Sequence, residues 1–444
     1  MLSDPTTTVL GADPSHRRCS LNGNAFQQDV MTSFRGWQYA AFYSFLDGVP
    51  EPLYIHLARR QLPKGPWEVI VLDNYPQTVD DGHNTVQLGI CAGDGTIHLS
   101  FDHHCDILRY RVSVPRVALD PPAFQWTSGL FLPTQSNLPR YSGSRAALQY
   151  VTYPRFIPIN TTGGLLFTVR DGKAGLGNDH LFRYARSEEE YKYTYIGQYI
   201  TGIWSNPYIH GLNYRNGKLH VTWVWRGWVE YEGWDDPADV KHKMQAGPNG
   251  PENNHDLCYA WSTDLGNTWK NTAGATIANV GSQETISNHS PVVTVFEISK
   301  GCGLTNQEAQ AVDHAGGVHV LNRDNVDGEL VWRHYYRDPS TGVWAKRAVC
   351  PVPGPSRGRL AISKIGDLYL ILPDGEKREV KIVKSAKIDE YSRYEEVWAG
   401  NGLTGEPLVD TARLDEDDVL SVFLIADIQG EEMAKNVVVS DFEL

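Results

Sequence analysis

The stretch NPYIHGLNYRNGKLHVTWVWRG (residues 206–227) decides the fold of this chain. It reads as an apolar strand, a turn with glycine and a second apolar strand. After an insertion, HDLCYAWSTDLGNTWKN (255–271) adds a third strand that ends near a tryptophan. This unit recurs along the sequence, and such internal repetition is typical of a β-propeller, in which each unit forms one blade.

Six further segments repeat the pattern of paired apolar strands around a turn. They are 37–60, 83–113, 152–187, 306–324, 358–376 and 405–427. Seven units of about 45 to 60 residues fit seven blades. We therefore predict an all-β fold, a seven-bladed β-propeller of four-stranded antiparallel blades. Residues 1–444 form a single propeller domain in this interpretation, with an N-terminal extension over 1–24 and a long loop over the active-site face at 228–254.

The composition favours the same fold class. Aromatic residues make up 11% of the chain, and there are 41 Gly and 25 Pro against 4 Met. That mixture suits twisted strands joined by tight turns. The net charge of −13 argues against nucleic acid as a partner, because phosphate binding needs an excess of Lys and Arg. No apolar run reaches the roughly 18 residues of a membrane span, so we expect no membrane partner.

The start of the sequence bears on localisation. Residues 1–18, MLSDPTTTVLGADPSHRR, are polar and lack the apolar run of a signal peptide. Either the protein is intracellular or the sequence begins at a processed or engineered start, and our expectation is an extracellular protein. The six cysteines are scattered without a CxxC pair, which favours buried thiols over a disulfide framework.

The segment STDLGNTW (262–269) reads as an Asp box, a hairpin motif that is fairly specific for propellers. Its role is turn chemistry: Asp264 can accept backbone N–H bonds and Gly266 can supply a positive φ. Trp269 is expected to pack between blades. The motif lies on the outer side of a blade, so we assign it no part in catalysis.

Propeller topology places a second set of residues at one rim of the ring. The innermost strand of each blade starts where the next strand ends, and propellers generally bind small ligands at that rim. Imidazole, phenol, guanidinium or amide groups recur there in five units. They are Gln38, Tyr39, Arg59 and Arg60 in the first unit; His83, Asn84, Asp102, His103 and His104 in the second; Tyr153 and Arg170 in the third; His210 and Arg226 in the fourth; and Asn306, Gln307 and Arg323 in the fifth.

The hexapeptide FDHHCD (101–106) lies at this rim, where two adjacent histidines leave the strand in opposite directions. They cannot easily chelate one ion together, since a metal site needs three or four ligands at close quarters. One of the two histidines is therefore structural. His104 is favoured for the pocket because the turn after it can break the alternation, but His103 stays an alternative.

The rim set lacks the carboxylate pair that ordinary glycoside hydrolysis requires. It fits abstraction of the proton next to a carboxylate, as in β-elimination at a 4-linked uronic acid. Arg170 or Arg226 can neutralise the carboxylate by a bidentate contact. A neutral histidine can take the C5 proton, and Tyr153 can donate to the departing O4 oxygen. Charge that develops on the substrate is stabilised by the fixed cation.

Several motifs resemble the BNR-repeat propeller polysaccharide lyases, which include ulvan lyases and the L-rhamnose-α-1,4-D-glucuronate lyases that act on gum arabic. They are DGHNTVQLGI, DGTIHLSFDHH, VTYPRF, LLFTVRDGKAGLGN, KLHVTWVWR, NNHDLCYAWSTDLGNTW and NQEAQAVD. The resemblance spans about residues 25–345. It implies eliminative cleavage, with catalytic roles for His83, His104 or His103, Tyr153 and Arg170. Asn84, His210, Arg226, Gln307 and Arg323 are then substrate-binding candidates.

The resemblance also implies a substrate and partners. We expect an acidic polysaccharide or oligosaccharide, cleaved at the rhamnosyl-α-1,4-glucuronate linkage of gum arabic or arabinogalactan side chains by an exo-acting enzyme. An endo-acting ulvan lyase is the alternative. We expect a monomer that needs no cofactor for its chemistry. Some relatives carry a structural calcium or zinc, so a structural divalent cation is allowed here, although no ligands are assigned.

Two interpretations from other classes stay open. A sialidase-like glycoside hydrolase also has Asp boxes, but it needs an arginine triad and a Tyr/Glu nucleophile pair, for which the sequence offers no convincing N-terminal motif. A non-catalytic sugar-binding propeller would use aromatic platforms such as Trp223, Trp225 and Trp228. It would have no need of His83 or Tyr153.

Overall fold

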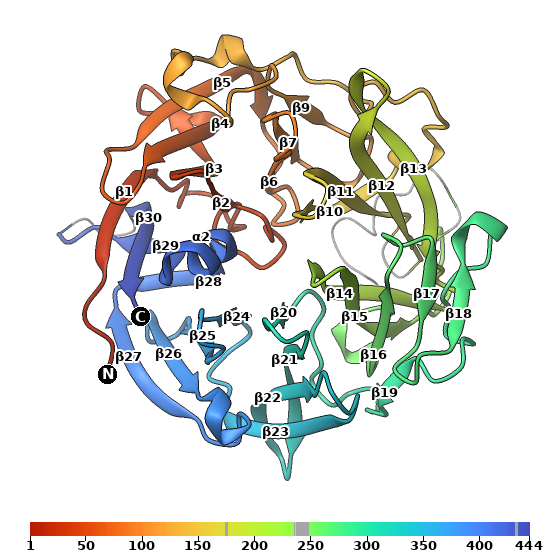
Figure 1. The fold of residues 1–444 in the computed structure, drawn as a ribbon. Helices are drawn as coiled ribbons and strands as arrows, with labels where there is room; N and C mark the ends of the chain where they lie inside the picture. Colours follow the sequence, from red (N-terminus) through yellow and green to blue (C-terminus); the bar gives the residue numbers. More distant parts are fainter. Residues whose placement is uncertain (174–175, 235, 237–247, 431–433) are drawn as a thin grey trace.

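The computed structural model describes residues 1–173, 176–234, 236, 248–430 and 434–444. Seven antiparallel sheets are arranged as a ring around a central axis (Figure 1), which confirms the predicted seven-bladed β-propeller. The strands nearest the centre, one for each blade, are β2 (Met31–Phe34), β6 (Val86–Ile90), β10 (Val151–Ile159), β14 (Ser205–Arg215), β20 (Ala309–Val312), β24 (Arg359–Ile362) and β28 (Leu403–Val409).

Four blades have the expected four strands. The first continues from β2 to β3 (Trp37–Leu46), β4 (Val49–Gln61) and β5 (Glu68–Gln77). The fifth continues from β20 to β21 (Val318–Val326), β22 (Glu329–Arg337) and β23 (Trp344–Pro351). The sixth adds β25 (Leu368–Asp374), β26 (Glu379–Ser385) and β27 (Glu395–Asn401). The seventh adds β29 (Val419–Asp427), β30 (Lys435–Glu443) and β1 (Thr6–Ala12).

Three blades depart from four strands. The second has only β6, β7 (Ile97–Phe101) and β9 (Tyr110–Val112). The third has β10, β11 (Gly164–Asp171), β12 (Asn178–Ser187) and β13 (Glu190–Ile200), and β8 (His104–Asp106) joins it beside β10. The fourth has β14, β15 (Lys218–Gly227), β16 (Asn254–Ser262), β17 (Thr268–Lys270), β18 (Thr276–Asn279) and β19 (Thr294–Phe296).

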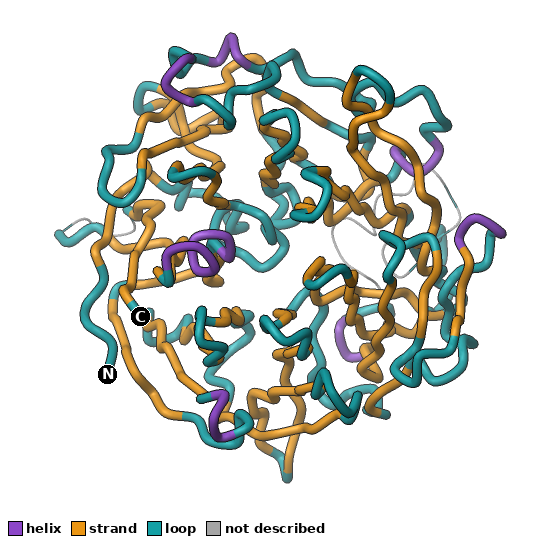
Figure 2. Tube along the Cα trace, viewed as in Figure 1, coloured by secondary structure: helices purple, strands orange, loops and turns teal. Residues whose placement is uncertain are grey.

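Helical segments are short, as Figure 2 shows. The described α-helix is α2 (Thr411–Asp417), and single 3-10 turns cover Pro121–Ala123, Ser128–Leu130, Ala146–Leu148, Pro251–Asn253, Val280–Ser282 and Lys387–Asp389. Within the part of the chain that the structure describes, no helix is long and apolar enough to cross a membrane.

The N-terminal segment is part of the ring, which corrects the expected extension over 1–24. β1 pairs antiparallel with β30, so that Thr6 lies opposite Asp441 and Ala12 lies opposite Asn436. The first strand of the chain thereby completes the blade that the last strands build. Pairing between the two ends of the sequence closes the ring, and it removes the open edge that β30 would otherwise present.

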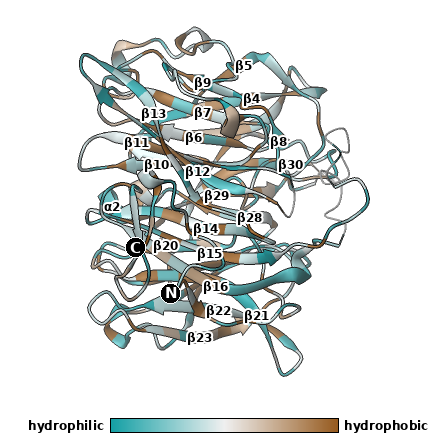
Figure 3. Ribbon diagram, turned by 90° about the vertical axis from the view of Figure 1, so that its right-hand side faces the viewer, coloured by the Kyte–Doolittle hydropathy of each residue, from teal (hydrophilic) through white to brown (hydrophobic). Residues whose placement is uncertain are grey.

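The first blade is shifted by one strand from the sequence interpretation. The four-residue β2 is its innermost strand, so β3 is the second strand and its start lies at the opposite rim. Gln38 there donates to Asp410 at the start of α2, at 2.8 Å, and Arg60 forms an ion pair with Asp441 at 2.6 Å. In Figure 3, α2 and β8 lie on opposite faces of the ring. Gln38, Tyr39, Arg59 and Arg60 therefore do not belong to the rim that carries β8.

The Asp box adopts the predicted turn. Asp264 accepts a hydrogen bond from the backbone N–H of Thr268 at 2.8 Å, and Gly266 has a φ of 93°. Trp269 is fully buried and stacks on Tyr199 of β13, with ring centroids 5.2 Å apart. Because β13 belongs to the preceding blade, this contact joins two blades, and the predicted packing of Trp269 is confirmed.

The predicted loop at 228–254 lies partly outside the described residues, which exclude 235 and 237–247. Its described ends contact the segment after Arg170. The Lys173 ammonium donates to the carbonyl oxygens of Trp234, at 3.1 Å, and Asp236, at 2.6 Å. The backbone N–H of Trp228 donates to the Trp204 carbonyl at 3.1 Å. These ends therefore border the rim that holds Arg170.

Candidate active site

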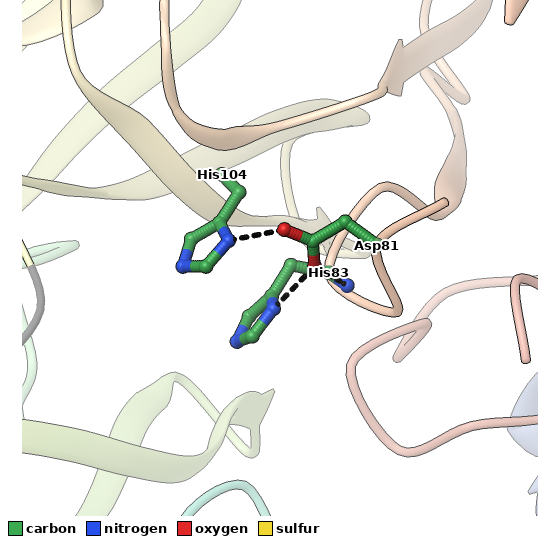
Figure 4. A group of neighbouring side chains, drawn as sticks. All are labelled: Asp81, His83 and His104. Atoms are coloured by element: carbon green, nitrogen blue, oxygen red, sulfur yellow. Dashed lines mark hydrogen bonds and ion pairs between the residues drawn. The ribbon is translucent and has the colours of Figure 1, made fainter. Parts of the chain in front are cut away.

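Asp81 and two histidines form the centre of the site (Figure 4). Asp81 accepts a hydrogen bond from Nδ1 of His83 at 2.8 Å and from Nδ1 of His104 at 2.6 Å. The two imidazole rings stack with their centroids 3.8 Å apart. Since a carboxylate only accepts hydrogen bonds, each Nδ1 carries its hydrogen, and each neutral ring has its lone pair on Nε2. Both Nε2 atoms point away from Asp81 (Figure 4).

The backbone around β8 explains how His104 reaches His83. Asp102 and Cys105, on either side of the two histidines, have φ values of 63° and 53°. These left-handed residues interrupt the regular alternation of side chains along a strand. β8 leaves the second blade and pairs with the third, where His104 lies opposite Thr152. The structure thus brings His104, and not its neighbour, against His83.

His103 has a different environment. Its side chain is buried, and its Nε2 accepts a hydrogen bond from the backbone N–H of Arg109 at 2.8 Å. Burial, followed by the charge of Arg109, holds the pKa of His103 well below its usual value. His103 therefore stays neutral and stabilises the loop between β8 and β9, and the structure does not place it in the site.

The electrostatic environment determines the protonation states of Asp81 and His83. Burial raises the pKa of Asp81, but the hydrogen bonds from His104 and His83 outweigh it and hold that pKa well below its usual value. Burial, followed by the electrostatic interaction with the adjacent His104 ring, lowers the pKa of His83 to about 4 although Asp81 opposes the shift. His83 is therefore a neutral imidazole near neutral pH. Its side chain is 25% exposed, so Nε2 is accessible as a base.

Tyr153 lies beside His83, with 5.6 Å between the ring centroids. Phe26 packs against both, at 4.7 Å from the His83 ring and 5.2 Å from the Tyr153 ring. The amide of Asn306 donates to the Tyr153 hydroxyl at 3.5 Å. Burial and the neighbouring Tyr208 raise the pKa of Tyr153, against the effect of the nearby arginines. The phenol is therefore protonated at neutral pH and can donate a proton.

Two predicted arginines flank one aromatic ring. The guanidinium groups of Arg170 and Arg226 lie 5.3 Å and 4.3 Å from the ring centroid of Tyr208, which in turn lies 6.1 Å from the Tyr153 ring. Tyr208 thus contacts both guanidinium groups as well as the ring of Tyr153. Nε of Arg170 is buried and has no partner among the described residues, whereas Nε of Arg226 donates to Asn254 at 2.7 Å. The other two guanidinium nitrogens of Arg170 donate to backbone carbonyls, so both cations are fixed in position by protein groups.

A third cation, Arg357, was absent from the predicted set. Its guanidinium lies 4.9 Å from the ring centroid of Phe26 and donates to the backbone oxygen of Asn306 at 2.7 Å. It also forms an ion pair with Glu406 at 3.3 Å. Arg357 thus holds the amide that donates to Tyr153, and its positive charge contributes to the lowered pKa of His83.

Of the predicted substrate-binding residues, Asn84 lies next to His83, and its buried Oδ1 has no partner among the described residues. His210 is fully buried within β14, four residues along the chain from Asn206, the partner of Arg226 in the strand register. Its Nε2 faces the amide of Asn322 at 3.2 Å, and burial lowers its pKa to about 3.

Gln307 and Arg323 are both bound within the protein. The Gln307 amide oxygen accepts from Arg155. Arg323 forms an ion pair with Glu308 at 2.5 Å and donates to the carbonyls of Gly354 and Ser356 at 2.9 and 2.7 Å. The structure therefore does not bring His210, Gln307 or Arg323 to the histidine pair. His210 lies on β14, Gln307 just before β20 and Arg323 on β21, where each has partners within the protein.

Sequence reasoning missed four residues that build this site: Phe26, Asp81, Tyr208 and Arg357. Asn306 was in the predicted rim set, but its bond to the phenol was not predicted. Asp81 could have been predicted from the sequence, because an aspartate two residues before a histidine can accept hydrogen bonds from the backbone N–H and the ring of that histidine. Its carboxylate accepts from the backbone N–H of His83 at 2.9 Å. Most of the other contacts join residues of different blades, as between Arg357 and Asn306, so the sequence pattern within one blade does not predict them.

The same group is where a metal ion could be held. Asp81, His83 and His104 each offer one potential ligand atom, and these three atoms lie within 4.8 Å of one another. Both Nδ1 atoms are already bonded to the carboxylate, so an ion would have to use the two Nε2 atoms. Two ligands are fewer than the three or four of a zinc site. The arrangement thus suits proton transfer better than metal binding.

Replacing Asp81 with Asn tests the role of this carboxylate as a positioning residue. The two Nδ1–H groups bond different oxygens of Asp81, and an amide replaces one of these acceptors with an NH2 donor, so one ring loses its fixed tautomer. We expect kcat for the proposed elimination to fall by about 10- to 100-fold with little change in KM. Asp80→Asn is the matched control, since Asp80 bonds the backbone of Arg18 and Cys19. An equal loss in both variants would contradict the assignment.

The fold and the site define a seven-bladed β-propeller whose titratable and cationic side chains gather on one face. The chain belongs to the BNR repeat-containing family, whose model matches residues 37–351. Proteins described as "Ulvan lyase, long isoform" from Alteromonas sp and from Pseudoalteromonas sp. (strain PLSV) are 27% and 26% identical over 308 residues, or 58% of this chain and 28% of each relative. The match thus spans less than a third of the length of those relatives.

Two solved structures share the fold over nearly the whole chain. The polysaccharide lyase Uly1 superimposes with a TM-score of 0.70 at 16% identity, covering 100% of this chain and 99% of that one. A PL25 ulvan lyase gives a TM-score of 0.65 at 13% identity, with coverage of 98% and 96%. At these identities the likeness concerns the fold.

Proposed function

We propose that this protein is a polysaccharide lyase that cleaves a 4-linked uronic acid by β-elimination. One observation carries the proposal: the neutral His83 lies beside the protonated Tyr153, whose ring in turn lies beside Tyr208, the ring that the cationic Arg170 contacts. These are the three functions that elimination next to a carboxylate requires. The names of the ulvan lyase relatives support the same reaction class.

In the proposed reaction, Arg170 binds the C6 carboxylate of the uronate through its guanidinium. Its charge stabilises the carbanion that develops when the C5–H bond breaks. His83 accepts the C5 proton on Nε2, while Asp81 stabilises the imidazolium that forms. Tyr153 donates its hydroxyl proton to O4 as the C4–O4 bond breaks. A double bond then joins C4 and C5, and the released sugar carries the new hydroxyl.

The lowered pKa of His83 predicts the acidic limb of the pH profile. The base must be neutral, so kcat/KM is retained as the pH falls until it approaches about 4, and it is lost below that value. An unperturbed histidine would give a limb near its usual pKa of about 6.5. The measurement is kcat/KM against pH, which reports the groups of the free enzyme. A limb near that unperturbed value would contradict the assignment of His83 as base.

The proposed substrate is the rhamnosyl-α-1,4-glucuronate linkage of gum arabic or arabinogalactan side chains, cleaved by exo action. The support is the resemblance of the motifs around His83, Tyr153 and Arg170, together with the described ends of the 228–254 loop beside Arg170. An endo-acting ulvan lyase is the second candidate, and the names of the curated relatives favour it. We further propose an extracellular monomer that needs no cofactor for its chemistry, with a structural divalent cation allowed elsewhere.

Product analysis separates these candidates. The protein is incubated with gum arabic and with ulvan, and the products are analysed by size and mass. Exo action on gum arabic releases rhamnose and leaves a long chain with an unsaturated terminal uronate. Endo action on ulvan gives a rapid fall in chain length and short unsaturated oligosaccharides. Products that carry an added water, without unsaturation, would identify a hydrolase instead.

A further inference from the structure

Trp204 is an exposed aromatic residue at the rim of the ring. Its side chain is 62% exposed, and its φ is 51°. A positive φ is unfavourable for a bulky residue and persists only where the surroundings enforce it. The Trp204 carbonyl accepts from the backbone N–H of Trp228 at 3.1 Å, which holds this conformation. Trp204 thus combines an unfavourable backbone conformation with a large aromatic ring that is exposed to solvent.

Trp204 lies next to the proposed active site. Trp204 immediately precedes β14, in which Asn206 pairs with Arg226. Two residues of extended chain span about 7 Å, so the Trp204 backbone lies roughly that far from the strand position opposite Arg226. The preceding Gly202 is tied to the segment after Arg170, because its N–H donates to Asn178 at 3.1 Å.

A largely polar hollow lies near the start of β14. It has a volume of about 620 Å³ and is lined by His255, Asp256, Thr294, Glu297, Ile298, Ser299 and Lys300. Ser205 reaches this lining, since its Oγ lies 3.2 Å from Nε2 of His255. Lys300 lies against Gly227, the partner of Ser205 in the strand register, because a Cβ on Gly227 would be 2.2 Å from its Nζ. The hollow is open to solvent rather than enclosed.

We propose that Trp204 and the hollow lined by His255 and Lys300 form an additional sugar-binding subsite, which holds a ring beyond the two that flank the cleaved bond. This inference rests on the proposed function and deepens it. The apolar face of a sugar packs on an exposed aromatic ring, while its hydroxyls bond the polar lining. A hollow lined by side chains of both charge signs suits a hydroxyl-rich chain better than an apolar protein surface.

The test compares two substrates in Trp204 variants. One substrate is the gum arabic or ulvan polymer, whichever the wild type cleaves, and the other is the rhamnosyl-α-1,4-glucuronate disaccharide. Trp204→Ala is expected to raise KM for the polymer about five- to tenfold and to leave kcat unchanged. The disaccharide kinetics should stay as in the wild type. Trp204→Tyr should retain most of the polymer affinity, and Ile388→Ala, at a residue that is 90% exposed, is the matched control.

The outcomes separate the subsite from the reaction. An active wild type with unchanged polymer kinetics in Trp204→Ala would overturn the subsite alone. Equal losses on polymer and disaccharide would also overturn it, since they point to a structural role. A change of oligomeric state in the variant, measured by light scattering, would assign Trp204 to a protein interface. A wild type that forms no unsaturated product from either polymer would overturn the proposed function, and the subsite with it.

Discussion

Tyr153→Phe is expected to lower kcat for elimination by about 10³-fold, because it removes the proton donor for the leaving oxygen. The aromatic ring stays, so its contacts with Phe26, His83 and Tyr208 are preserved. The only hydrogen bond lost among those that the structure assigns to this hydroxyl is the long one from Asn306. The variant should therefore fold normally. The measurement is the initial rate of unsaturated product with the polymer, alongside the melting temperature.

Tyr214→Phe is the matched control. Tyr214 lies on β14 near its far end, and its hydroxyl bonds Thr161. We expect its removal to leave kcat unchanged. A Tyr153→Phe variant that turns over at near the wild-type rate would show that another group protonates the leaving oxygen.

Arg170→Leu is expected to lower kcat/KM by about 10²- to 10³-fold, equivalent to several kcal/mol of transition-state stabilisation. Without this cation the substrate carboxylate stays negative and resists removal of the C5 proton. The variant also loses hydrogen bonds to the carbonyls of Gly172 and Lys173, so folding must be checked by circular dichroism. The assay is kcat/KM for formation of the unsaturated product.

Arg170→Lys separates charge from geometry, since it keeps the positive charge and loses the bidentate contact. We expect it to recover part of the activity. Arg226→Lys is the informative companion, because Arg226 is already bonded to Asn254 and Asn306. If Arg170→Leu were as active as the wild type while Arg226→Lys was inactive, Arg226 would be the neutralising residue.

The propeller could be predicted because its determinants are local. Each blade repeats a period of apolar strands and turns, and the Asp box specifies one hairpin by residue type. Asp264 and Gly266 have the predicted roles because a turn depends on neighbours within a few residues. The strand count was harder, since β2 has only four residues and β1 belongs to a blade built by the other end of the chain.

The site was predictable only in part. His83, Tyr153 and Arg170 were predicted to share one rim because each lies near the start of an innermost strand or the end of the strand after it, and the structure places them at that rim. Arg323 follows the same topology, yet Glu308 and two carbonyls bind it inside its blade. Whether a rim residue faces a ligand or an internal partner depends on contacts between blades, which strand periodicity does not contain.

The choice between His103 and His104 shows the same limit of prediction from sequence for two adjacent residues. Regular alternation gives the two rings opposite directions but does not say which direction leads to the site. The positive φ values of Asp102 and Cys105 decide it in the structure. Neither residue is a glycine, so the sequence does not mark these positions as left-handed.

Ultraviolet absorbance of the conjugated C4–C5 double bond tests the central claim most directly. The protein is incubated with gum arabic and with ulvan, and absorbance is followed together with the release of new sugar ends. The account predicts that absorbance rises in step with new ends on one of the polymers. New ends without a rise in absorbance would contradict it, because the bond would then have been hydrolysed.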